Sequence, residues 1–337
     1  MKGNDRNIEM CQMQNLRKKA IVISLLCLLH LTVYGQAIDN TWSFKNIKRD
    51  KYFRFSYEND YFASADRYYT QGINIELVAP WVKNFPLTKL LIHPKNSYLR
   101  YGLGIEDDAY TPTSTDKNEI LFGDRPYASF FILKTFLIAI DPKRMQRFSA
   151  TWSIGIIGPA TGAMDLHTAI HRIVPNNSIP KGWSNQIGND AILNYQVNYE
   201  KQLLSSEHFF SLDADGMIRI GSLSDKASAG LTMILGYFES PFSDKKATKG
   251  NVSIYGYEHP ELDVTGYDAT LEGGVFNKRS PYTLGPGDIS HFTFQNRFGI
   301  VFVTHRLHLE YFRTFLSKEF NTGLTHKWGG LQIALAF

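Results

Sequence analysis

Cysteine is almost absent from this sequence. The chain has 337 residues and two cysteines, Cys11 and Cys27, and both lie within the first 36 residues. Because we expect those 36 residues to be removed, as argued next, the remaining chain has no thiol for a disulfide or for a thiolate metal site. This absence excludes folds that depend on disulfides and zinc sites built from cysteine.

Long apolar runs are also scarce. The longest covers residues 20–34 and follows the basic residues Arg17, Lys18 and Lys19. It is shorter than the roughly 20 apolar residues that a membrane-spanning helix needs. A short apolar run behind basic residues is typical of a cleaved secretory signal. We therefore expect residues 1–36 to be a signal peptide and residues 37–337 to form one domain.

The chain also has no large excess of positively or negatively charged residues. The formal net charge of the whole chain is +4 at pH 7. Residues 1–36 contain five basic and two acidic residues, which leaves 31 Lys and Arg against 30 Asp and Glu in the rest. A nearly neutral mature chain gives no support for binding to nucleic acid.

What the sequence has in abundance is alternation between apolar and polar residues. Across residues 53–58, two Phe and one Tyr alternate with Arg, Ser and Glu. A period of two indicates β-strands. Similar segments recur to the last residue, and we count about twelve strands: 53–58, 73–77, 99–106, 127–140, 148–157, 195–200, 210–215, 228–238, 262–273, 292–303, 307–311 and 331–337. Residues 240–261 fit this scheme poorly, so we expect a misplaced strand boundary there.

Two folds suit this pattern, a soluble sandwich and a membrane β-barrel. In a membrane barrel the apolar faces meet lipid and the polar faces line the lumen, and the sheet must close because every backbone polar group needs a partner. The signal peptide, the absence of thiols, the aromatic residues near strand ends and the final Phe337 favour the barrel. We predict an all-β, transmembrane, antiparallel barrel of about twelve strands, with Val197 facing lipid and Gln196 facing the lumen.

Polar residues gather in three connections that this topology places on one rim. If both termini are periplasmic, the connections after the first, third and fifth strands are extracellular. The polar candidates in them are Asn59, Asp60 and Thr70, then Lys117, then His167 and His171. The short connection Asp141–Arg144 suits a periplasmic turn, and we expect a short helix in the longer one at 85–96. The sequence thus predicts a functional site at the extracellular rim, where scaffolds commonly place function.

The chemistry of these residues leaves alternatives open. His167 and His171 are four residues apart and would share one face of a helix. Thr168 stands where a zinc protease has glutamate, so that class is excluded. A lone catalytic histidine acting as general base remains possible, as does a pair packed within a loop helix. Asn59 and Asp60 offer oxygen atoms suited to calcium, or cap their loop. No Gly-x-Ser-x-Gly motif is present, which excludes a serine-hydrolase elbow.

Seven motifs carry a resemblance to a known family. They are Asn59-Asp60, DRYYTQG at 66–72, GDRPYA at 123–128, IGPATG at 157–162, His171-Arg172 with GWSNQ at 182–186, SPYTLG at 280–285 and TFLSKEF at 314–320. Together they resemble the outer-membrane lipid A 3'-O-deacylase family. The resemblance implies a twelve-stranded barrel in the outer membrane of a Gram-negative bacterium. It also implies calcium-dependent hydrolysis of the 3'-linked acyloxyacyl group of lipid A, the lipid of lipopolysaccharide. We expect a monomer.

The resemblance also implies roles for the rim residues. Asp60 would bind Ca²⁺, Asn59 and Thr70 would shape the site, His171 would activate the attacking water, and Lys117 falls at the position of the family's active-site lysine.

One departure concerns an acidic residue that the family has shortly after this histidine. Residues 174–178 read VPNNS here, and Asp190 is a candidate substitute. A phospholipase-like or catalytically degenerate member therefore remains an alternative, as does a non-catalytic pore or structural barrel.

Overall fold

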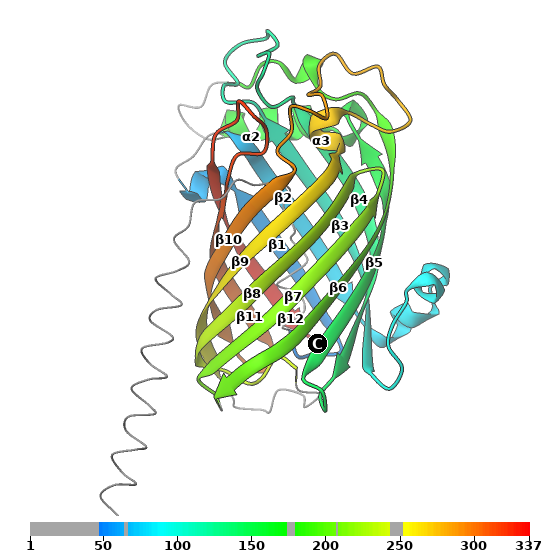
Figure 1. Ribbon diagram of the computed structural model, residues 1–337, viewed down its shortest axis with the longest axis vertical. Coiled ribbons are helices and arrows are strands. Elements are labelled where there is room, and N and C mark those ends of the chain that lie inside the picture. Colours follow the sequence, from blue (N-terminus) through cyan, green and yellow to red (C-terminus); the bar gives the residue numbers. More distant parts are fainter. Residues whose placement is uncertain (1–46, 64–66, 174–178, 207, 243–251) are drawn as a thin grey trace, which may run out of the picture. The chain divides into compact units, whose positions relative to one another are not determined.

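The chain forms a closed antiparallel β-barrel (Figure 1). The computed structural model describes residues 47–63, 67–173, 179–206, 208–242 and 252–337, so the expected signal peptide lies outside the described residues. Within these residues the strands are β1 (Tyr52–Asn59), β2 (Tyr68–Val78), β3 (Tyr98–Thr111), β4 (Ala128–Asp141), β5 (Gln146–Ile157), β6 (Asp190–Ser206), β7 (Phe210–Gly221), β8 (Ser224–Tyr237), β9 (Ser253–Asp268), β10 (Phe292–Val303), β11 (Leu307–Leu316) and β12 (His326–Ala336). The predicted twelve-stranded barrel is confirmed.

Closure depends on the first and last strands. Each strand pairs with its neighbours in sequence, and β1 pairs with β12 from Tyr52 opposite Ala336 to Asn59 opposite Gly329. In the part of the chain that the structure describes, no helix is both long and apolar enough to cross a membrane.

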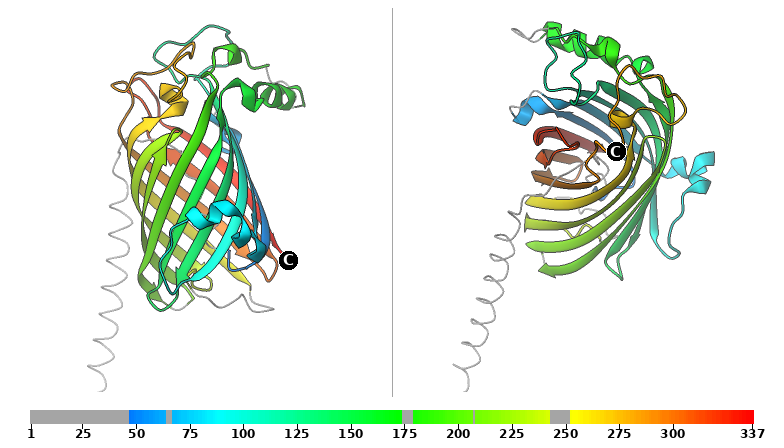
Figure 2. Two further views of the ribbon diagram at one scale, coloured as in Figure 1. Left: turned by 90° about the vertical axis from the view of Figure 1, so that its right-hand side faces the viewer. Right: turned by 45° about the horizontal axis from the view of Figure 1, so that its top comes forward.

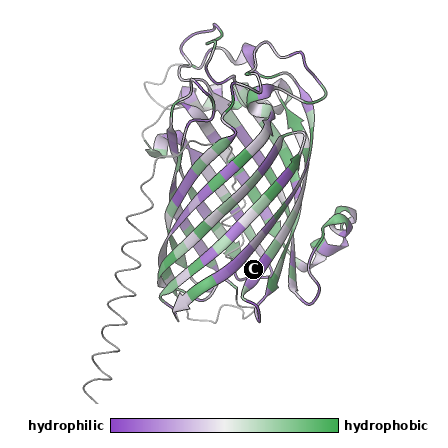
Figure 3. Cartoon of the chain, in the orientation of Figure 1, coloured by the Kyte–Doolittle hydropathy of each residue, from purple (hydrophilic) through white to green (hydrophobic). Residues whose placement is uncertain are grey.

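The two faces of the strands are assigned as alternation predicts, which Figure 3 shows as alternating colours along each strand. On β1, Arg54 and Glu58 are each 1% exposed, whereas Phe53 is 42% exposed. On β6, Gln196 is buried and donates a hydrogen bond to Asn198 Oδ1 at 3.0 Å. The polar face therefore lines the lumen, and the apolar face covers the outside of the barrel.

Several strand boundaries differ from the sequence prediction, and the largest difference is at β9. Residues 262–273 were expected to form one strand, but β9 begins at Ser253 and ends at Asp268, and the short helix α3 (Ala269–Glu272) follows. Asp268 ends the strand because its carboxylate Oδ1 accepts from the backbone N of Thr270 at 2.8 Å and caps the helix. The poor fit at 240–261 came from placing the start of β9 too late.

The short connections gather at one end of the barrel and the long ones at the other. The β4–β5 and β10–β11 connections are short, whereas residues 112–127, 158–189 and 269–291 form long loops at the opposite end. Short turns are periplasmic and long loops extracellular in barrels of this kind. An exception is the β2–β3 connection, which holds the 3₁₀ helices η3 (Pro80–Asn84) and η4 (Pro86–Leu90). The short helix predicted at 85–96 is thus confirmed.

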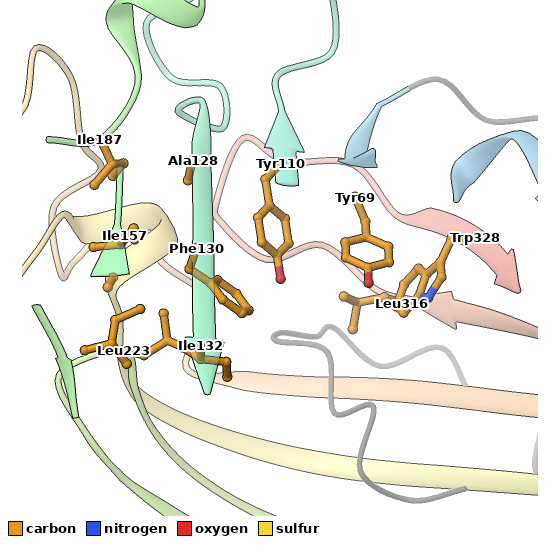
Figure 4. Packing of buried hydrophobic residues seen from close by; sticks show 12 residues of the cluster. Tyr69, Tyr110, Ala128, Phe130, Ile132, Ile157, Ile187, Leu223, Leu316 and Trp328 are labelled. Atoms are coloured by element: carbon orange, nitrogen blue, oxygen red, sulfur yellow. The ribbon is translucent and has the colours of Figure 1, made fainter. Parts of the chain in front are cut away.

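Aromatic side chains fill the lumen toward its extracellular end (Figure 4). The ring centroids of Tyr69 and Trp328 are 5.2 Å apart, and those of Tyr69 and Tyr110 are 5.5 Å apart. Phe130 and Leu316 belong to the same buried cluster. Side chains from β2, β3, β4, β11 and β12 therefore meet across this end of the lumen.

Ion pairs and a second apolar cluster lie further along the lumen. Arg54 Nε donates to Glu76 Oε2 at 3.0 Å, and Lys134 Nζ donates to Glu106 Oε2 at 2.6 Å. Toward the periplasmic end, Ile47 packs among inward-facing residues of β1, β2, β4 and β12. Side chains from both ends thus occupy the space that an open channel would need, which argues against the pore alternative.

The facing of the strands predicts a stability effect that depends on depth. Phe298 lies near the middle of β10 and is 47% exposed, and Phe292 begins the same strand and is 69% exposed. Phe298→Arg should lower the free energy of unfolding by ~2–4 kcal/mol, and Phe292→Arg by only ~0–1 kcal/mol, because the cost of arginine falls toward the membrane interface. Urea titration of barrels refolded in bilayers measures both. Equal costs would contradict the depth assigned to β10.

Candidate active site

The β1–β2 hairpin brings three of the predicted residues together. Asn59 ends β1, and its Nδ2 donates to the backbone oxygen of Thr70 at 2.6 Å, while its Oδ1 accepts from the backbone N of Tyr61 at 2.8 Å. Asp60 opens the 3₁₀ helix η2 (Asp60–Ala63), is 6% exposed, and accepts from the backbone N of Arg67 at 2.9 Å. The amide of Asn59 and the carboxylate of Asp60 therefore fix the turn.

Thr70 lies within a strand and not in the loop where the sequence scheme placed it. The pairing of β2 with β3 shifts register between Tyr69 and Gln71, so Thr70 sits at an irregularity of the ladder. Its Oγ1 lies 2.7 Å from Oγ1 of Thr111, the last residue of β3. Bulges of this kind re-aim a side chain, and here the hydroxyl joins the face on which Thr111 lies.

This face is the outer wall of the barrel. Asn59 continues the outward series that begins with the exposed Phe53 and Phe55 on β1. Thr111 continues the outward series of β3, in which Ile105 is 40% exposed. The sequence predicted a site on the extracellular rim, but it did not predict that the site faces the surrounding lipid.

The β5–β6 loop folds down over this outer wall. Ala109, two residues before Thr111 on β3, is fully buried because Tyr127, Ala163 and Trp183 pack against it. Ala163 begins the helix α2 (Ala163–Ile173), and Trp183 begins the 3₁₀ helix η6 (Trp183–Asn185). Figure 2, right, shows α2 outside the ring of strands. The helix that carries the two histidines is thus anchored beside the end of β3.

The two histidines share one face of α2, as predicted, with ring centroids 4.4 Å apart. His167 is 3% exposed, and its Nδ1 accepts a hydrogen bond from Trp183 Nε1 at 3.1 Å. Because an indole N–H can only donate, Nδ1 carries no proton in this arrangement. Burial, with a smaller contribution from the charge of His171, lowers the pKa of His167 to about 4. His167 is therefore neutral at pH 7, and its free lone pair is used by Trp183.

His171 lies one turn further along and is only half buried. A general base must reach water and accept its proton. Of the two rings, His171 has the greater exposure that this role requires, whereas His167 holds Trp183 in place. The structure thus separates a supporting histidine from a candidate base.

Lys117 lies in the β3–β4 loop and is exposed. The backbone of this loop is tied to the segment around Trp183, because Lys181 N donates to Thr115 O at 2.7 Å and Asn185 Nδ2 donates to Asn118 O at 2.8 Å. Lys117 therefore lies beside the Trp183 segment, on the side of the barrel that holds α2.

Gly182 is the residue that permits this close packing. Its φ is +92°, and a Cβ placed there would lie 2.9 Å from Tyr127 Cε2 and 3.1 Å from Lys117 O. Gly182→Ala should loosen the contact between the two loops, because a non-glycine residue in the left-handed region costs roughly 1–2 kcal/mol and the new methyl group meets both neighbours. Hydrogen exchange should rise at 112–118 and 179–187 and stay unchanged in the strands. Gly287→Ala, where nothing lies within 4 Å of the added Cβ, is the matched control. Equal protection in both variants would contradict this role.

Several residues of the recognised motifs hold loops to one another. Asp124 Oδ2 accepts from the backbone N of Thr113 at 2.9 Å. Arg125 donates to Thr270 Oγ1 at 2.7 Å and lies over the ring of Tyr110 at 4.2 Å. Arg125 Nη1 also donates to Glu319 Oε2 at 2.5 Å, so the motif GDRPYA at 123–128 connects the β3–β4 loop to the β9–β10 and β11–β12 loops, a role that sequence reasoning missed.

Asp190 forms hydrogen bonds with the β9–β10 loop. Its Oδ2 accepts from the backbone N of Phe276 at 2.7 Å and of Asn277 at 3.0 Å, which anchors the β9–β10 loop. Its suggested role as the substitute acid gains no support from these contacts. Residues 174–178, where the departure from the family pattern occurs, lie outside the described residues.

The chemistry of the β1–β2 turn suits a hard cation. Asp60 contributes a buried carboxylate, and the turn around it offers carbonyl oxygen atoms, the ligand type that Ca²⁺ prefers. Among the described residues, a group of three metal-ligating side chains occurs instead at Asp215, His259 and Glu261 in the lumen. A cation at Asp60 would therefore depend on backbone oxygen and water for most of its ligands.

Comparison with known proteins agrees with this architecture. Residues 21–337 match the family model described as outer membrane protein LpxR. A search of the curated proteins found no match. Among solved structures, LpxR from Salmonella typhimurium is similar with a TM-score of 0.69 and 18% identity, covering 85% of this chain and 100% of that chain. The β domain of the Bordetella autotransporter BrkA matches with a TM-score of 0.44 and 7% identity, covering 85% of this chain and 99% of that chain. An outer membrane channel from Pseudomonas putida F1 matches with a TM-score of 0.44 and 10% identity, covering 89% and 100%.

Proposed function

Because this chain belongs to the LpxR family of outer membrane proteins of Gram-negative bacteria, we propose that it is a calcium-dependent esterase that removes the 3'-linked acyloxyacyl group of lipid A. The observation that carries the proposal is the position of the candidate residues. Asn59 and Thr70 lie on the outer wall at the extracellular ends of β1 and β2. The loops that carry Lys117 and His171 pack beside the end of β3. Lipid A in the outer leaflet would meet these residues from the side, without leaving the membrane.

His171 is the proposed general base. It would take a proton from a water molecule whose oxygen attacks the ester carbonyl, so that a C–O bond forms and the carbonyl oxygen becomes negatively charged. When this intermediate collapses, the ester C–O bond breaks and the released sugar hydroxyl takes the proton from His171. Trp183 supports the base indirectly, because its hydrogen bond to His167 fixes the turn of α2 that precedes His171.

Asp60 and Lys117 are the proposed electrostatic partners. Asp60 would hold Ca²⁺, which supplies positive charge to a developing oxyanion when it is bound. Lys117 is exposed on a tethered loop, where its ammonium group would attract either that oxyanion or a phosphate of lipid A.

Asn59 and Thr70 would shape the site. The side-chain Nδ2 of Asn59 donates to the backbone oxygen of Thr70 at 2.6 Å, and the Thr70 hydroxyl lies 2.7 Å from the Thr111 hydroxyl. The contact made by Asn59 ties the end of β1, which Asp60 immediately follows, to β2.

A phospholipase-like or catalytically degenerate protein with the same site is the second candidate. The sequence VPNNS at 174–178 favours it, because it has no carboxylate at the place where the family has an acid. A different substrate or a lost activity would both fit that change.

An assay of the purified mature protein in detergent tests these candidates. Lipid A and a glycerophospholipid are supplied separately, with calcium or with a chelator, and the products are identified by mass spectrometry. We expect lipid A to lose the mass of its 3'-linked acyloxyacyl group only when calcium is present. Release of acyl chains from the glycerophospholipid alone would favour the phospholipase, and no product from either lipid would favour the degenerate member.

A further inference from the structure

The connection between β2 and β3, residues 79–97, packs against the outside of the barrel. We call it the β2–β3 arm, and it is the cyan segment beside the strands in Figure 1. Leu91 is 4% exposed because it packs among outward-facing residues of β4, β5 and β6. The backbone N of Ile92 donates to the hydroxyl of Tyr195 at 3.0 Å, and that hydroxyl donates to Leu90 O at 3.3 Å. The arm is therefore attached to the wall that faces lipid.

The arm exposes large apolar side chains next to positive charges. Five of its large apolar residues are more than a third exposed: Trp81, Phe85, Leu87, Leu90 and Ile92. Its three lysines, at positions 83, 89 and 95, are also exposed, and residues 79–97 contain no Asp or Glu. Apolar and aromatic residues interleaved with lysine are typical of segments that lie in a membrane interface.

Part of the backbone of the arm forms hydrogen bonds within the arm. Val82 N donates to Ala79 O at 3.1 Å, and the same spacing recurs in Phe85, Thr88 and Leu91, each of which donates to the carbonyl three residues earlier. Thr88 Oγ1 is also within hydrogen-bond distance of Lys83 O at 2.8 Å and Phe85 O at 2.6 Å. Backbone groups that are paired in this way lose fewer bonds to water when the segment enters a membrane interface.

A groove separates the arm from the wall. It has a volume of about 410 Å³ and lies between Phe85 and Leu87 of the arm and Leu77, Leu103, Leu133 and Trp152 of the strands. A second hollow of about 490 Å³ is lined by Ile92 and by residues of β6 and β7, and Trp152 lines both hollows. Because these strand residues face the hydrocarbon of the membrane, the groove opens to acyl chains and not to water.

We propose that the β2–β3 arm binds a glycerophospholipid of the periplasmic leaflet, with an acyl chain in the groove and the phosphate beside the arm lysines. The arm lies at the periplasmic end, opposite the candidate active site, so the lipid it meets belongs to the inner leaflet of the outer membrane. Three exposed lysines in a segment whose sequence contains no Asp or Glu complement a phosphate group. This inference is independent of the esterase activity proposed above.

The charge part is tested by lipid binding to the full mature chain in detergent. Dioleoyl phosphatidylglycerol is titrated and bound lipid is counted by native mass spectrometry. Lys83→Gln, Lys89→Gln and Lys95→Gln together should weaken binding on the order of 100-fold, because each lysine near an anionic lipid contributes ~1 kcal/mol. The matched control changes three exposed basic residues at the same end: Lys51→Gln, Lys143→Gln and Arg144→Gln. Equal affinity in the two triple variants would overturn the proposal.

The groove part is tested with brominated acyl chains, which quench nearby tryptophan. The fluorescence of Trp152 is obtained as the difference between the fluorescence of the wild type and that of Trp152→Phe. Brominated phosphatidylglycerol should quench it at about one lipid per protein, and Phe85→Ser with Leu87→Ser should abolish that quenching. Phe298→Ser with Phe302→Ser on β10 is the control, since both residues are exposed on the outer wall elsewhere. Quenching that survives in the arm variant, or dimers that form through the arm without bound lipid, would overturn the proposal.

Discussion

Replacing His171 with glutamine should lower the rate of lipid A deacylation by roughly 10²–10⁴-fold, the usual cost of losing a general base. Glutamine keeps the polarity of the side chain but cannot accept the proton from water. The barrel should fold normally, because His171 lies on α2 and outside the strands. Single-turnover assays on lipid A, with heat-modifiable migration as the test of folding, measure the two quantities separately.

His167→Gln is the matched control for this variant. The structure shows His167 buried against Trp183, with Nδ1 as an acceptor, and a glutamine Oε1 can accept the same hydrogen bond. Most of the activity should therefore remain. If both substitutions were equally damaging while calcium dependence persisted, α2 would be presenting two metal ligands. If an active preparation tolerated both, the base would lie elsewhere.

Replacing Asp60 with asparagine should weaken calcium binding and lower the rate of lipid A deacylation. Added calcium should restore part of that rate. The amide keeps an oxygen that can accept the bond from Arg67 N, so the turn is preserved, but it loses the charge that attracts the ion. Because ligand charge tunes calcium affinity over several orders of magnitude, the concentration for half-maximal rate should rise by at least ~10-fold.

The rate is measured against free calcium concentration in both proteins, with a chelator as the zero point. Glu119→Gln removes an exposed carboxylate from the neighbouring β3–β4 loop and should leave the curve unchanged. A wild-type rate that does not respond to the chelator would refute the calcium requirement. An unchanged curve for Asp60→Asn would place the ion at other residues.

Alternation was enough to predict the strands and their facing. The runs around Phe53 and Gln196 obey a strict period of two, and burial in a lipid surrounding assigns each face without further information. The boundary near Ser253 was missed, since His259 and Glu261 on the lumenal face of β9 make that strand look like a polar loop in the sequence.

The site was predicted less completely than the fold. Motifs and loop order placed Asn59, Asp60, Lys117 and His171 on one rim. The outward direction of the site depends on the register shift at Thr70 and on loops that pack over Ala109. Both arise from contacts between residues far apart in the chain, which local patterns do not encode.

The seam between β1 and β12 bears on how this barrel is made. Arg54 Nη1 donates to Gln332 Oε1 at 2.6 Å, and Trp328 Nε1 donates to Glu58 Oε2 at 2.8 Å, across 278 and 270 residues of sequence. Until the last strand arrives, Arg54 and Glu58 lack these partners and β1 has an unpaired edge. Pairing β1 with β12 satisfies these side chains and the strand edge together. Barrels in which only some of this pairing has formed should therefore be short-lived during assembly. Because β12 is synthesised last, β1 cannot complete its pairing until the whole chain has been made.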